Sequence, residues 1–98
     1  MIGARESYSR AITAGEWAGF SCSLDEPGDP ARVEAALGSS ASAVSQALRQ
    51  PAEMTEAQDR LVFDLLEHEA QHHGQLIRYV YALGVEIPAS WRARYALD

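Results

Sequence analysis

The residue types best suited to chemistry lie in one short stretch, HEAQHHGQ, which spans residues 68–75. Two of its imidazoles, His68 and His72, are four residues apart, so a helix would place both on one face, within reach of one metal ion. The first five letters also spell H-E-x-x-H, the motif in which a residue such as Glu69 activates a zinc-bound water in peptidases. The stretch therefore predicts a metal site, and the rest of the chain must decide its chemistry.

The surrounding sequence argues against a zinc peptidase. One residue, His73, separates His72 from Gly74, whereas the extended peptidase motif places two residues before the glycine and a third histidine after it. The downstream carboxylates Glu86 and Asp98 lie in the short C-terminal tail, where no helix is predicted to present a ligand. No segment shows the strand pattern that would hold an extended peptide substrate. The motif is therefore better explained as a pair of metal-type ligands on a helix.

Two further interpretations of these residues stay open. Glu69 and His72 form E-x-x-H, the di-iron motif of ferritin-like bundles, which a symmetric dimer would supply twice. Glu6 and Glu34 would be the other carboxylates, although both lie off the apolar stripes of their predicted helices. The other interpretation is that the histidines are core residues satisfied by hydrogen bonds without a metal. Two imidazoles within an aliphatic stripe are costly to bury without a shared partner, which favours the metal site.

Composition and charge exclude several classes of function. The 98 residues suffice for a single small domain, 1–98. Fourteen acidic against eight basic residues give a net charge of −6, which argues against nucleic acid or an anionic membrane as a partner. Cys22 is the only cysteine, which fits a reducing compartment. Because neither a membrane-spanning run nor a signal-peptide pattern is present, we expect a cytoplasmic protein.

Apolar periodicity predicts an all-α domain with three main helices, near residues 2–14, 30–49 and 56–83. Glycines at positions where a helix must stop, Gly15 and Gly84, follow the first and the third of them. The residues between the first two helices carry turn formers without periodicity, so they are predicted to form a long connector.

Capping residues define where the second and third helices begin. Asp29 can cap the second helix, and Pro30 suits its first position. Thr55 and Gln58 have capping-box spacing at the start of the third. Near the C-terminus, Ser90 could cap one last helical turn.

The third helix has an unusually wide apolar face. One stripe has residues spaced by threes and fours: Leu61, Leu65, His68, His72, Leu76, Tyr79 and Leu83. A second row lies beside it: Val62, Leu66, His73, Ile77 and Val80. Together they cover roughly half the circumference of a helix about 42 Å long, more than two shorter helices can cover. We therefore predict a homodimer.

The last helix and its exit, HEAQHHGQLIRYVYALGVEIPASW, resemble the DinB-like (YfiT-like) family of metal-binding four-helix bundles. The family's pattern there is H-x-x-x-H-x-G-Q-L, an aliphatic and aromatic stretch, L-G and a nearby proline. The matching residues are His68, His72, Gly74, Gln75, Leu76, Leu83, Gly84 and Pro88. The opening MIGARESYSRAI, followed by GEW, is similar to the family's second helix and its exit.

This resemblance implies an up-down four-helix bundle in which three histidines hold a divalent metal such as zinc, nickel or iron. His68 and His72 would be two of these ligands. The third belongs to the family's second helix and would fall just ahead of Met1, so we expect an N-terminally short bundle that lacks the first helix and is completed by dimerisation.

Enzymatic members of the family are thiol-dependent transferases or isomerases, whereas many others have no known activity. The expectation is a DinB-like protein of unknown specific function that binds a metal, with no catalytic residue assigned and enzymatic activity left open. One alternative is a metal-dependent S-transferase or isomerase acting on a small thiol and active only as a dimer. A second alternative is a metal-free helical interaction module.

Overall fold

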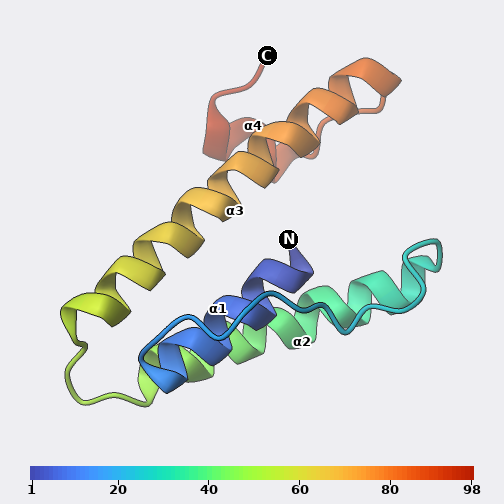
Figure 1. The fold of residues 1–98 in the computed structure, drawn as a ribbon. Coiled ribbons are helices and arrows are strands. Elements are labelled where there is room, and N and C mark those ends of the chain that lie inside the picture. Colours follow the sequence, from blue (N-terminus) through green and yellow to red (C-terminus); the bar gives the residue numbers. More distant parts are fainter. The chain divides into compact units, whose positions relative to one another are not determined.

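The computed structural model describes all of residues 1–98, and every regular element in it is a helix (Figure 1). The elements are α1 (Ile2–Ala14), α2 (Pro30–Arg49), α3 (Glu56–Leu83) and α4 (Ala89–Tyr95). The predicted all-α class and the bounds of the three long helices are confirmed. None of the helices combines the length and the apolar character that crossing a membrane requires. The chain forms two compact units, Met1–His68 and Glu69–Asp98.

In the first unit, α1 and α2 lie side by side and run in the same direction (Figure 1). Arg5, early in α1, donates from Nη1 to the carbonyl of Leu37 in the first half of α2 at 3.3 Å. At the other end, Ala14 lines the same shallow depression as Gln50, the residue that follows α2. The up-down order expected from the resemblance does not hold for this pair, because successive up-down helices are antiparallel.

The connector between α1 and α2 makes this parallel arrangement possible. Residues 15–29 run back along α1, so that Ser21 N donates to Ser7 Oγ and Ser23 N donates to Glu6 Oε2. An extended segment of this length reaches roughly 50 Å, which exceeds the ~20 Å length of α1. The chain can therefore return to the level at which α1 began before α2 starts. The predicted long connector thus has a structural role.

The connector lies close against the first turn of α1. A Cβ built on Gly3 would lie 2.6 Å from Phe20 Cζ and 2.9 Å from Cys22 Cβ, distances that no side chain tolerates. Gly3 is therefore required here because of close approach by the connector.

Small side chains form the contact surface of α1 and α2. Ala4, Ala11 and Ala47 are at most 3% exposed, and the largest fully buried side chain is Ile12. Ser40 is also buried and donates to the carbonyl of Leu37, so its hydroxyl is satisfied. Small residues let helix backbones approach closely, but they remove little apolar area from water. The core of the first unit is consequently thin.

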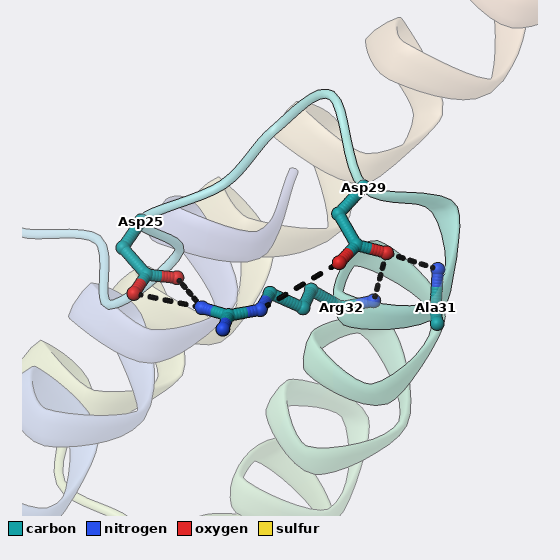
Figure 2. A network of polar contacts seen from close by, with 4 residues as sticks. All are labelled: Asp25, Asp29, Ala31 and Arg32. Atoms are coloured by element: carbon teal, nitrogen blue, oxygen red, sulfur yellow. Dashed lines mark hydrogen bonds and ion pairs between the residues drawn. The ribbon is translucent and has the colours of Figure 1, made fainter.

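The predicted helix caps of α2 and α3 are confirmed. Asp29 accepts from the backbone N–H groups of Ala31 and Arg32 at 3.0 and 3.4 Å (Figure 2). Thr55 and Gln58 exchange the two reciprocal bonds of a capping box, at 2.9 and 3.1 Å.

The start of α4 differs from the prediction. Pro88, not Ser90, occupies the N-cap position, and its carbonyl accepts from Trp91 N and Arg92 N, both at 3.0 Å. Because Pro88 has an extended ψ of 139° and the helical residues begin directly after it, Ser90 falls inside the first turn. The last helical turn was therefore predicted correctly, but its cap was not.

Candidate functional site

His68 and His72, the predicted metal ligands, lie on α3 with the expected spacing of four residues. Both side chains are of intermediate exposure, so they are neither fully solvated nor sealed in a core. One continuous helix carries both, which places them on the same helical face. The helical placement is thus confirmed, and metal binding by these two residues stays a prediction.

The ring of His72 is oriented by the next turn of the same helix. Its Nδ1 lies 3.2 Å from Oε1 of Gln75. An amide oxygen can only accept a hydrogen bond, so this contact requires a proton on Nδ1; in the neutral ring the lone pair is then on Nε2. Metal-ligating histidines in proteins show this pattern, in which the second ring nitrogen donates to an oxygen that fixes the tautomer.

A second group of polar residues lies nearby on the second unit and was not predicted from the sequence. His73 has its Nδ1 2.7 Å from the hydroxyl oxygen of Tyr95 in α4, and its Nε2 3.5 Å from Oε2 of Glu69. The rings of His73 and Tyr95 also meet edge to face, with centroids 6.1 Å apart. In the sequence, His73 falls on the second apolar row of α3, and Glu69 is part of the H-E-x-x-H motif.

The contacts of His73 join two helices. Its Nδ1 shares a hydrogen bond with the Tyr95 hydroxyl, and its Nε2 faces the Glu69 carboxylate. Tyr95, His73 and Glu69 thus form a chain of polar contacts that connects α4 to α3. The contact between Glu69 and His73 could be expected from the sequence, since a glutamate and a histidine at i and i+4 are neighbours on a helix. Tyr95, the partner of His73 in α4, is 22 residues away, and no local spacing in the sequence indicates this contact.

No set of three or more histidine, cysteine, aspartate or glutamate side chains is arranged to hold a metal ion in this structure. A catalytic zinc site has three protein ligands and one open position, so His68 and His72 would be two of the three.

The di-iron interpretation also loses one of its carboxylates. Glu6 accepts from the backbone N–H and from the hydroxyl of Ser23, and so holds the connector against α1. Glu34, the other candidate, is exposed on α2.

Two groups of residues in α3 and α4 are relevant to function. They comprise two imidazoles on one helical face, one of them in contact with Gln75, and a separate cluster of Tyr95, His73 and Glu69 between α3 and α4. Comparisons with known proteins add no constraint: no family model, no curated protein and no solved structure matches the chain.

Proposed function

We propose that this chain is a DinB-like helical protein that binds a divalent transition metal through His68 and His72 of α3. The contact between His72 and Gln75 is the observation that carries the proposal, because a neutral ring that donates from Nδ1 to an amide oxygen has the orientation and tautomer of metal-ligating histidines. Neutral imidazoles suit zinc, nickel and iron, which are the metals expected from the resemblance. The adjacent Gly-Gln-Leu sequence supports the same assignment, since it is part of the family's pattern.

The proposal includes a second copy of the chain as the source of a further ligand and of missing helical cover. Two protein ligands leave positions on a metal ion for water or for a residue of another molecule. The apolar side of α3 supports such a partner, since Leu66 and Leu76 are 64% and 40% exposed. A helical bundle completed by dimerisation would cover these side chains and bring additional donors to the metal.

Titration of the tag-free, chelator-treated protein with Zn²⁺ and Ni²⁺ in a calorimeter tests the proposal. We expect one metal site per chain or per dimer, lost in both His68→Ala and His72→Ala. His73→Ala is the matched control and should keep the site, since this ring is engaged with Tyr95. Gln75→Leu should weaken binding about tenfold or more, as loss of an orienting partner does elsewhere.

Two results would contradict the proposal. The first is undiminished metal binding by the His68→Ala/His72→Ala double variant, with helicity confirmed by circular dichroism. The second is absence of binding by the wild-type chain, which would favour the metal-free interaction module. The thiol S-transferase alternative predicts turnover of a small thiol by the metal-loaded protein only, lost together with the metal in His72→Ala.

A further inference from the structure

A cavity of about 630 Å³ lies in the first unit, apart from the histidines, between the end of α1 and the first turns of α3. Its size is within the range of small-molecule sites in proteins. The lining residues include apolar side chains and ionisable ones: Gly15, Glu16, Trp17, Thr55, Glu56, Ala57, Arg60, Leu61 and Asp64. The mixture would suit a ligand with an apolar body and a charged group.

One wall of the cavity is formed by an indole that is held in place while it remains accessible. Trp17 is 48% exposed, and its ring lies against that of Tyr8, with centroids 5.0 Å apart and planes inclined by 56°. Trp17 keeps this tilted contact with Tyr8 while it also lines the cavity. A tryptophan face attracts cations more strongly than the other aromatic rings do.

The opposite wall is anchored to the end of α1. Gln58 donates from Nε2 to the carbonyl of Ile12 at 2.8 Å and also closes the capping box with Thr55. These bonds fix the first turn of α3, and Leu61 and Asp64 of the following turns also line the cavity. The cavity is therefore bounded by two anchored elements.

The electrostatic character of the lining distinguishes between possible ligands. Three carboxylates, from Glu16, Glu56 and Asp64, face one guanidinium, from Arg60. Burial, with the charges of Asp64 and Glu67, raises the pKa of the Tyr8 hydroxyl behind the indole. The charge of the lining therefore complements a cation.

We propose that this cavity binds an organic ammonium ion with an apolar body, placed with its cationic group between the face of Trp17 and the carboxylates of Glu16 and Asp64. The apolar part would lie against Leu61 and Ala57. Cation–π and carboxylate contacts favour an ammonium group, and the apolar floor favours an aryl or alkyl chain attached to it. The site does not involve His68 or His72 and needs no metal.

Fluorescence titration of Trp17 tests this site with three probes of similar size: phenethylammonium, 2-phenylethanol and 3-phenylpropanoate. A Trp91→Phe background leaves Trp17 as the single indole, and chelator keeps metal absent. We expect phenethylammonium to bind most tightly, with an affinity that falls as salt is raised. Trp17→Leu, followed by competition calorimetry, should weaken binding about two- to fivefold.

Charge variants provide the decisive comparison. Glu16→Gln and Asp64→Asn should each weaken phenethylammonium binding, whereas Glu53→Gln, an exposed carboxylate outside the lining, should not. Equal or tighter binding of 3-phenylpropanoate would overturn the proposal, since Arg60 would then dominate. So would absence of saturable binding by any probe, or unchanged affinity in the Glu16→Gln/Asp64→Asn double variant. An affinity that falls as protein concentration rises would show instead that a second copy occupies the cavity.

Discussion

Tyr95 is the residue through which the last helix is attached to α3. Its hydroxyl lies 2.7 Å from Nδ1 of His73, a short hydrogen bond between side chains 22 positions apart. The neighbouring Arg94 guanidinium lies over the Tyr95 ring at 5.8 Å from its centroid, so the ring has contacts besides the hydroxyl. Removing the hydroxyl alone therefore tests the hydrogen bond while the contacts of the ring are kept.

Tyr95→Phe should lower the free energy of unfolding by about 1 kcal/mol, the typical net contribution of such a bond. Tyr81→Phe is the matched control, because Tyr81 is 51% exposed and loses only a solvated hydroxyl. Urea denaturation followed by circular dichroism measures both. Equal midpoints for the two variants would mean that the bond to His73 does not stabilise the fold.

Ionisation of the Tyr8 hydroxyl makes the stability of the fold depend on pH in the alkaline range. Burial, and then the negative charges of Asp64 and Glu67, raise the pKa of its hydroxyl above the usual value of 10.0. The neutral phenol is therefore favoured in the folded state, and its contribution to stability is complete below pH 10. As pH rises further, the unfolded chain loses this proton first, so stability falls until the folded phenol also ionises.

Spectrophotometric titration of the folded protein should show one phenol ionising later in the wild type than in Asp64→Asn. The decrease in stability above pH 10 should be shallower in Tyr8→Phe than in the wild type. An identical alkaline decrease in both proteins would contradict the role assigned to Tyr8.

From the sequence, the place of a residue on a helical face could be predicted better than the residues that it contacts. The stripe on α3 predicted His68 and His72 on one face, because helical spacing is a local property. His72 contacts Gln75, one turn further along the same helix, whereas His73 contacts Tyr95 of α4. The bond to Tyr95 depends on how the chain turns after α3, which no local spacing encodes.

At the scale of elements, caps explain why the helix bounds were predictable. A residue such as Asp29, directly ahead of a proline, satisfies free N–H groups of the first helical turn and so defines its start. The direction of α2 relative to α1 was not predictable in this way. It depends on the path of the 15–29 connector, which is held by hydrogen bonds of Ser7 and Glu6 to residues more than a dozen positions away.

Two aspartates near the start of α2 allow a capping bond to be compared with a surface ion pair (Figure 2). Asp29 accepts from two backbone N–H groups, whereas Asp25 contacts only the exposed guanidinium of Arg32, at 3.0 Å. Asp29→Ala should cost about 1 kcal/mol of stability. Asp25→Ala should cost less than about 0.5 kcal/mol, because exposed ion pairs contribute little. Thermal unfolding of both variants at low and high salt tests the difference, and a larger loss in Asp25→Ala would contradict it.

For the molecule as a whole, the balance of buried and exposed apolar residues is unusual. The buried apolar residues number seven, and three of them are alanines: Ile2, Ala4, Ala11, Ile12, Ala47, Leu65 and Ile87. Ten large apolar residues are exposed by 40% or more. Leu65 of α3 is buried, whereas its neighbour Leu66 is 64% exposed. Exposure elsewhere on α3 is nevertheless extensive.

The exposed apolar residues of α3 in the second unit form one helical face. Leu76, Tyr79 and Leu83 are 40%, 57% and 75% exposed, and their spacing of three and four residues aligns them. Burying a side chain of this kind contributes roughly 1.5–3 kcal/mol. An isologous contact would bury the face of each copy against the other, so every stabilising contact would occur twice. The stabilisation gained by burying these side chains in both copies favours a second copy as the partner of α3.

Sedimentation equilibrium at micromolar concentration should therefore give twice the 10.7 kDa mass of one chain. Tyr79→Glu, which places a charge within the exposed face, should shift the protein toward monomer. Gln71→Glu adds the same charge at an exposed position on another side of α3, so it should leave the dimer intact. A folded wild-type monomer would show that α3 tolerates its exposed face, and loss of the dimer in both variants would trace association to charge instead. Dissociation in Tyr79→Glu alone assigns the interface to the apolar stripe, and metal titration of that monomer then measures what the second copy adds to His68 and His72.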